Sequence, residues 1–259
     1  MSPPRKLFVV GGSGFLGQAI CRSAISRGWE VLSLSRHGAP TGSTAQGSIG
    51  SRFMQRVQWI KGDALKPETF REHMEGCAAV VHSVGTLMEN DYKKLINVGY
   101  SSNASTESTT YERANRDTAL SVARVARLTD GLDAFAYISA SDVVPFLDPR
   151  YISTKREAEA ALLEHRDQLR SIILRPGFMF SSSRPVTLPV AAGVEVFRAL
   201  FNNTPVGCAL KNTPLAKAAN PAIRRQTVAD AVMNSIENPR ISGVLEIGDI
   251  VRIGSSSRA

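Results

Sequence analysis

Short apolar segments alternate with amphipathic segments along the first two thirds of the chain. Lys6–Val10 is an apolar run that ends in glycines, which is typical of a buried parallel strand. From Gly14 onward apolar side chains recur at helical spacing, and Gly28 is suited to end that helix. The same patterning predicts further strands at Glu30–Ser35, Val57–Ile60, Ala78–His82, Ala134–Ser139 and Ser171–Leu174, and helices from Pro67, at Tyr111–Leu128 and at Tyr151–His165. This alternation predicts an α/β fold, a Rossmann-type doubly wound parallel sheet with helices on both faces.

The pattern changes after Pro176, where repeated prolines break the chain into short pieces. Helices are expected near Val190–Phe201 and Thr227–Asn238. We expect residues 178–225 to form a small C-terminal cap on the substrate side of a single domain that covers residues 1–259. The Val190–Phe201 helix is apolar on nearly every side, so it is expected to be buried in the core or, alternatively, to face a hydrophobic substrate or a partner.

Two stretches lack a steady apolar period. Residues 38–51 are rich in Gly, Ser and Thr and are expected to form a flexible loop. Residues 85–109 hold many Ser, Thr and Asn, and a loop of that length is either a functional lid or disordered.

The bulk composition excludes several classes of protein. Of 259 residues, 43% are hydrophobic and 21% charged, so a globular core can form. The net charge is +8, but the basic residues are scattered, so we expect a solvated surface and no nucleic-acid partner. No apolar run is long enough for a transmembrane segment. Three cysteines without a C-x-x-C pair, and histidines without ligand spacing, predict no disulfide framework and no metal. The early first strand leaves little room for a transit peptide.

A glycine-rich loop joins the first strand to the first helix. Residues Gly11–Gly17 read GGSGFLG and fit both G-x-x-G-x-x-G and G-x-G-x-x-G. Such a loop makes a tight turn, brings the backbone close to a pyrophosphate and presents free N–H groups at the helix start. The alternative is a glycine-rich turn without a ligand. The residues expected to hold the cofactor here are Gly11, Ser13, Gly14, Phe15, Leu16 and Gly17.

The end of the second strand indicates which cofactor is preferred. A carboxylate there would bind the ribose of NAD, whereas an arginine accommodates the 2′-phosphate of NADP. The strand ends in Ser35-Arg36 without a carboxylate, so we predict NADP, with NAD as the alternative. Arg36 is otherwise a surface arginine. Asp63 follows the third strand, where it contacts the adenine amino group or serves as a turn or cap residue.

Three polar residues are expected at the same edge of the sheet. Tyr151 and Lys155 are spaced Y-x-x-x-K, which places them on one helix face, and Ser139 ends the fifth strand. A neighbouring ammonium is expected to lower the phenol pKa, so that Tyr151 transfers a proton while Ser139 polarises a carbonyl. Lys155 would also hold the nicotinamide ribose. The alternative is that Tyr151 and Lys155 only pack and bind cofactor, without catalysis.

Over nearly its whole length the chain resembles an atypical, extended member of the short-chain dehydrogenase/reductase family. The motifs that carry this resemblance are Gly11–Gly17, Asp63, Ser139, Tyr151 with Lys155, and Arg175-Pro176-Gly177. The resemblance implies further cofactor contacts from Ala64, Gly85 and Pro176. Asn115 lies where family members often place an asparagine, or is simply a residue of the helix surface.

Several longer phrases are similar to those of fungal mitochondrial dehydrogenase-like proteins of ubiquinone (coenzyme Q) biosynthesis, and more distantly to the dehydrogenase-like accessory subunit of respiratory complex I. They are Phe15–Gly17, Val81–Gly85, Tyr151–Glu159 and Leu174–Phe180. This narrower resemblance implies a mitochondrial location, association with the coenzyme Q biosynthetic complex at the inner membrane, and a small hydrophobic substrate. It leaves two main functions open, an NADP-dependent oxidoreductase of carbonyl or quinone-type rings or a non-catalytic, cofactor-loaded assembly factor. A sugar-nucleotide epimerase or dehydratase in the cytoplasm is a third.

Overall fold

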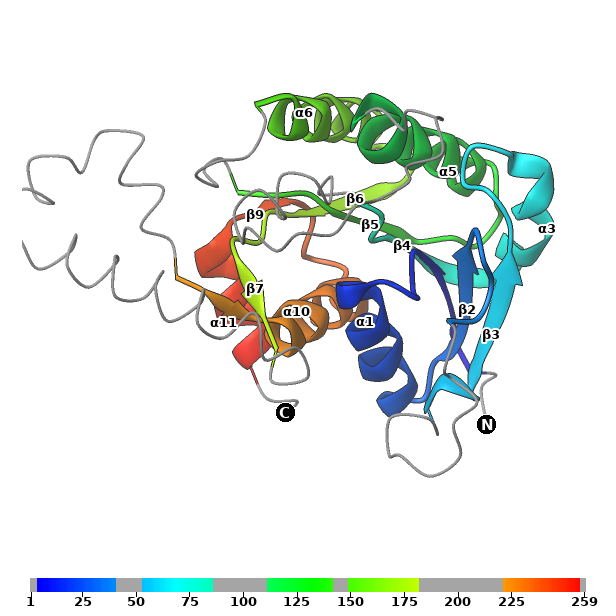
Figure 1. Ribbon diagram of the computed structural model, residues 1–259, viewed down its shortest axis with the longest axis horizontal. Coiled ribbons are helices and arrows are strands. Elements are labelled where there is room, and N and C mark those ends of the chain that lie inside the picture. Colours follow the sequence, from blue (N-terminus) through cyan, green and yellow to red (C-terminus); the bar gives the residue numbers. More distant parts are fainter. Residues whose placement is uncertain (1–3, 41–52, 86–110, 142–148, 182–220, 257–259) are drawn as a thin grey trace, which may run out of the picture.

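The computed structural model describes residues 4–40, 53–85, 111–141, 149–181 and 221–256. Their centre is a seven-stranded sheet with the order β3-β2-β1-β4-β5-β6-β9, and every neighbouring pair in it is parallel (Figure 1). The strands are β1 (Lys6–Val10), β2 (Glu30–Ser35), β3 (Val57–Lys61), β4 (Cys77–His82), β5 (Ala134–Ile138), β6 (Arg170–Leu174) and β9 (Gly243–Leu245). The predicted doubly wound Rossmann-type sheet is therefore confirmed.

Helices cover both faces of this sheet (Figure 1). One face carries α1 (Phe15–Ser26), α10 (Arg225–Glu237) and α11 (Ile247–Ser255). The opposite face carries α3 (Arg71–Met74), α5 (Thr118–Arg127) and α6 (Pro149–Glu164). No helix within the described part of the chain is both long enough and apolar enough to span a membrane.

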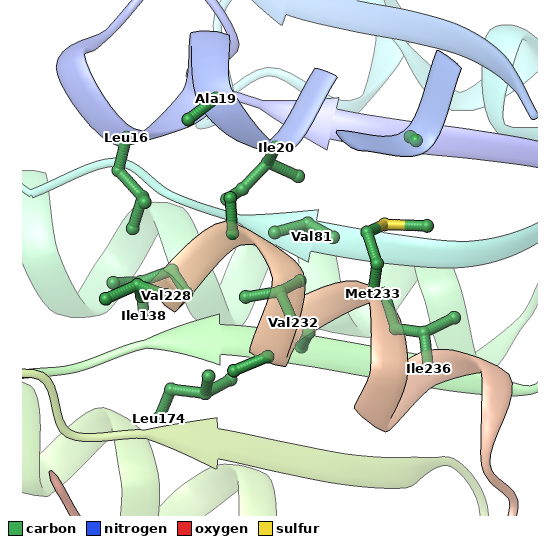
Figure 2. Packing of buried hydrophobic residues seen from close by; sticks show 14 of the residues in the cluster. Leu16, Ala19, Ile20, Val81, Ile138, Leu174, Val228, Val232, Met233 and Ile236 are labelled. Carbon is green, nitrogen blue, oxygen red and sulfur yellow. The ribbon is translucent and has the colours of Figure 1, made fainter. Parts of the chain in front are cut away.

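The two-sided burial of β1 explains why its sequence is apolar throughout. Leu7 and Val9 belong to the hydrophobic cluster under α1 and α10, whereas Phe8 and Val10 belong to the cluster under α5 and α6. All four side chains are buried, as expected of a central parallel strand with helices on both faces. In Figure 2, Val228 and Val232 of α10 point toward the sheet beside Ile20 of α1, which closes one of these cores.

The structure differs in a few places from the helices and strands that the apolar pattern predicted. The expected Tyr111–Leu128 helix begins with a π-helical segment, Glu112–Asp117, before α5, and α6 begins at Pro149 rather than Tyr151. Neither β9 nor α11 was predicted. β9 has only three residues, too few for a periodic signal, and the nine-residue α11 ends the described chain.

The ends of the predicted cap lie side by side. β7 (Met179–Phe180) pairs in parallel with β8 (Ile223–Arg224), which joins the two described ends of the segment 178–225. The predicted Val190–Phe201 helix lies outside the described residues, as do most of the loops predicted at 38–51 and 85–109.

Candidate functional site

A cavity of about 580 Å³ lies at the carboxyl ends of the central strands. The chain runs from β1 outward to β2 and β3 and then returns to place β4 on the other side of β1, so the loops after β1 and β4 diverge at this point. Ligands of open α/β sheets bind at such a position. Most of the predicted site residues line this cavity, namely Gly11, Ser13, Gly14, Phe15, Leu16, Arg36, Asp63, Ala64, Gly85, Ser139, Tyr151 and Lys155.

Two predicted cofactor contacts do not line the cavity. A Cβ on Gly17 would lie 2.2 Å from the carbonyl oxygen of Gly11, so this glycine lets α1 pack against the end of β1. Pro176 uses its carbonyl to accept a hydrogen bond of 3.0 Å from the backbone N–H of Ser141. Both positions therefore have a role in packing or backbone hydrogen bonding, and contacts from them to a cofactor remain predictions.

Gly14 differs from the other glycines of the loop. It precedes α1 as the helix N-cap and lines the cavity, and a Cβ there would meet no closer atom than the Gly11 carbonyl oxygen, at 3.1 Å. No side-chain hydrogen bond caps this helix start among the described residues. An anionic group such as a pyrophosphate fits this arrangement, because the helix N-terminus carries partial positive charge.

The far end of the cavity has groups suited to an adenosine. Arg36 and His37 follow β2 and line the cavity, and neither is a carboxylate. Asp63 follows β3 and also lines it, and its Oδ1 accepts a 3.0 Å hydrogen bond from the Leu65 N–H. The turn role of Asp63 is therefore present in the structure, and the adenine contact remains a prediction.

The three polar residues predicted for catalysis lie at the other end. Ser139 follows β5, Tyr151 lies in the first turn of α6, and Lys155 is one turn further along. The Lys155 Nζ donates a 2.8 Å hydrogen bond to the Ile138 carbonyl and lies 5.8 Å from the centre of the Tyr151 ring. The ring of Tyr111 packs edge-on against Tyr151 at 6.0 Å. The serine, the tyrosine and the lysine all line the cavity.

The prediction that Lys155 lowers the pKa of the Tyr151 phenol is wrong for the protein without a cofactor. Burial raises the pKa of Tyr151 to about 12, instead of the lysine lowering it. Burial lowers the pKa of Lys155 to about 7, a shift that Glu159 opposes. A lysine with that pKa is largely uncharged above neutral pH, and its Nζ donates to a backbone carbonyl rather than to the phenol. Sequence spacing does not report burial, so this correction required the structure.

The buried lysine predicts a pH dependence of stability. Its pKa is lower in the folded than in the unfolded chain, so the unfolded chain binds more protons and stability rises with pH above about 7. Between pH 7 and 8.5 the free energy of unfolding of cofactor-free wild type is expected to rise by about 1.5 kcal/mol relative to Lys155→Met. Urea unfolding of both proteins at a series of pH values measures this difference. Parallel curves for the two proteins would contradict the assigned burial.

Further groups lie around the lysine, and sequence reasoning had assigned no role to one of them, His82. His82 is fully buried, its Nε2 lies 3.1 Å from the Thr118 Oγ1, and burial lowers its pKa to about 3. Asn115 is not on the helix surface, which corrects that alternative. It is buried, and neither side-chain polar atom has a partner within the described chain. A Cβ on Gly85 would lie 3.0 Å from the Lys155 Nζ, so this glycine brings the backbone close to the end of the lysine side chain.

A second contact that the sequence did not reveal is that of Arg156 with Ser139. The guanidinium Nη1 donates a 3.1 Å hydrogen bond to the Ser139 Oγ. Arg156 follows Lys155 directly in the sequence. This adjacency was the one sequence signal that Arg156 lies near the site. Across the ranges that the structure describes, no group of three His, Cys, Asp or Glu side chains is placed to hold a metal ion.

The comparisons with known proteins agree with this geometry. The model of the NAD dependent epimerase/dehydratase family matches residues 7–187. The chain belongs to this family. The resemblance to short-chain dehydrogenases that the motifs predicted is thereby confirmed, and the family description supports a nicotinamide cofactor.

Two relatives match almost all of the chain. MIOREX complex component 2 of Saccharomyces cerevisiae is 32% identical over 275 residues, which cover 95% of this chain and 99% of that protein. An uncharacterized chloroplastic protein of Arabidopsis thaliana is 28% identical over 261 residues, or 98% of this chain and 79% of the other. Among solved structures, the UDP-glucuronic acid 4-epimerase of Bacillus cereus in complex with NAD superposes with a TM-score of 0.58 at 16% identity, over 93% of this chain and 76% of that one. That likeness shows the fold alone.

Proposed function

We propose that this chain is an NADP(H)-dependent oxidoreductase that acts on a carbonyl or a quinone-type ring. The observation that carries the proposal is that one cavity is lined at one end by the glycine loop and at the other by Ser139, Tyr151 and Lys155. When bound, a nicotinamide ring supplies or accepts hydride. The hydroxyl of Ser139 would then donate a hydrogen bond to the substrate oxygen, and the Tyr151 Oη would deliver the proton to that oxygen.

The remaining residues have binding roles in this proposal. The backbone of Gly11 and Gly14 would approach the pyrophosphate, and Lys155 would hold the nicotinamide ribose. The Lys155 Nζ is buried beside the Tyr151 ring, and Lys155 lines the same cavity as the glycine loop. We assign residues 1–259 to one domain, with residues 178–225 as the substrate-side cap.

The preference for NADP over NAD is assigned to Arg36. Its side chain is exposed at the cavity rim, and the end of β2 has no carboxylate to repel a 2′-phosphate. We expect wild type to bind NADPH more tightly than NADH, and Arg36→Ala to lose about tenfold or more in NADPH affinity, since a charge-assisted hydrogen bond contributes on the order of 1.5–3 kcal/mol. Isothermal titration with both cofactors measures this. Equal affinities in wild type, or an unchanged preference in Arg36→Ala, would refute the NADP assignment.

We further propose a mitochondrial location and a role in coenzyme Q biosynthesis, with a small hydrophobic substrate. The support is the similarity of Phe15–Gly17, Val81–Gly85, Tyr151–Glu159 and Leu174–Phe180 to fungal proteins of that pathway. A relative described as chloroplastic adds support for an organelle.

A second candidate is a cofactor-loaded assembly factor without turnover. Two observations favour it. The relative from Saccharomyces cerevisiae is named as a component of a complex, and burial raises the pKa of Tyr151 to about 12, which is high for a proton donor at neutral pH. The two candidates differ in what Tyr151→Phe does, because an assembly factor needs the ring and its packing but not the hydroxyl.

A further inference from the structure

A buried carboxylate lies between two arginines next to the catalytic end of the cavity. The side chain of Glu159 is only 3% exposed, and both Arg156 and Arg175 form ion pairs with it. The Nη1 of Arg175 also reaches Glu246, the N-cap of α11, at 2.7 Å. A buried carboxylate without such partners would destabilise the fold, so both ion pairs are expected to persist. Glu159 thereby fixes the positions of both guanidinium groups.

The guanidinium of Arg156 also donates hydrogen bonds to the segment after β5. Its Nη2 donates to the Ala140 carbonyl at 2.8 Å, and its Nη1 donates to the Ser139 Oγ at 3.1 Å. The backbone N–H of Ser139 is itself bonded to the Leu174 carbonyl at 2.8 Å. The backbone and the hydroxyl of the serine are therefore both held, the first by β6 and the second by α6.

The direction of the hydrogen bond from Arg156 decides what the serine hydroxyl can do. A guanidinium only donates, so the Ser139 Oγ must accept in this contact and its own proton is left for another acceptor. A neighbouring cation also makes a hydroxyl a better donor. The contact therefore leaves the Ser139 hydroxyl as a hydrogen-bond donor toward the cavity. A substrate carbonyl oxygen needs such a donor.

We propose that Arg156 is a positioning residue that acts through Ser139, fixing the hydroxyl as the hydrogen-bond donor to the substrate oxygen. This inference rests on the proposed function and extends it to a residue outside the serine, tyrosine and lysine set. Arg175 provides the matched comparison. It shares the carboxylate of Glu159, but its hydrogen bonds within the described structure go to Glu159 and Glu246 and not to Ser139. A purely structural ion pair would make the two arginines equivalent.

The test uses the full chain loaded with NADP⁺, with duroquinone as the probe because its four methyl groups prevent addition to thiols. Titration calorimetry measures the duroquinone Kd for wild type, Arg156→Met, Arg156→Lys and Arg175→Met, and for Ser139→Ala alone and combined with Arg156→Met. Thermal unfolding and the NADP⁺ Kd are recorded for each variant, because loss of an ion pair to Glu159 lowers stability in both arginine variants.

We expect Arg156→Met to weaken duroquinone binding about three- to tenfold, the size of one net hydrogen bond. Arg156→Lys is expected to recover part of this loss, and Arg175→Met to stay within about twofold of wild type. In the Ser139→Ala background the further change to Arg156→Met should have no effect. Equal losses with and without Ser139, equal losses from Arg156→Met and Arg175→Met, or wild type that does not bind duroquinone would overturn the inference.

Turnover of NADPH with duroquinone separates this inference from the proposed function. If wild type binds duroquinone in an Arg156- and Ser139-dependent manner but does not oxidise NADPH, the oxidoreductase proposal fails and the positioning of Ser139 stands. If wild type turns over and Arg156→Met matches it in kcat and in KM, the positioning inference fails and the oxidoreductase proposal stands.

Discussion

Replacing Tyr151 with phenylalanine is expected to lower quinone reduction by on the order of a hundred- to ten-thousand-fold, the usual contribution of a positioned acid. The substitution removes one hydroxyl and keeps the ring, so the edge-on packing against Tyr111 is retained. NADPH affinity and thermal stability should stay close to those of wild type, because the Lys155 Nζ is anchored on the Ile138 carbonyl and not on the phenol. Steady-state NADPH oxidation and calorimetry together measure both quantities.

Lys155→Met is the matched control for that result. It should weaken NADPH binding as well as turnover, since the side chain proposed to hold the nicotinamide ribose also lies beside Tyr151. Turnover of Tyr151→Phe at the wild-type rate would show that the hydroxyl does no chemistry, and the assembly role would then remain.

Gly14→Val is expected to abolish binding of both NADPH and NADH. A side chain at this position would occupy the space where the backbone approaches the pyrophosphate. The protein is expected to fold after a small local shift, because a Cβ there approaches a single atom closely, the Gly11 carbonyl oxygen at 3.1 Å. Calorimetric titration with both cofactors and circular dichroism of the variant test the two halves of this expectation.

Gly17→Val is the contrasting variant for Gly14→Val. Its Cβ would lie 2.2 Å from the Gly11 carbonyl oxygen and 2.7 Å from the Gly12 Cα, both of them backbone atoms that cannot give way cheaply. We expect this variant to lose stability first and cofactor binding as a consequence. A folded Gly14→Val protein with wild-type cofactor affinity would remove the phosphate-loop assignment.

The strands of the sheet could be read from the sequence because burial on both faces leaves a clear signal. Lys6–Val10 and Ala134–Ile138 are nearly continuous apolar runs, and both proved to be central strands. The glycine loop was equally readable, because Gly11 has a positive φ of 88° and a Cβ on Gly12 or Gly17 would lie within 2.3 Å of a neighbouring atom. β9 escaped prediction because a three-residue strand has no period to detect. α11 was missed although its buried Ile247, Ile250 and Ile253 recur at helical spacing, a signal that the sequence does contain.

The electrostatics of the site could not be read from spacing. Y-x-x-x-K places Tyr151 and Lys155 on one face of a helix but does not reveal that both are buried, which reverses the expected pKa shift of the phenol. The contact from Arg156 to Ser139 depends on where β5 ends relative to α6, and Glu159 meets Arg175 across sixteen positions of sequence. Such contacts follow from tertiary packing and leave no local pattern.

The most direct measurement of the central claim is a profile of quinone intermediates by mass spectrometry in cells that lack this chain. The cells are complemented at native expression level with wild type, Tyr151→Phe or Gly14→Val. The oxidoreductase account predicts that wild type restores coenzyme Q, and that both variants leave the same intermediate accumulated as in the uncomplemented cells. Full restoration by Tyr151→Phe, or a normal quinone profile in cells without the chain, would contradict it.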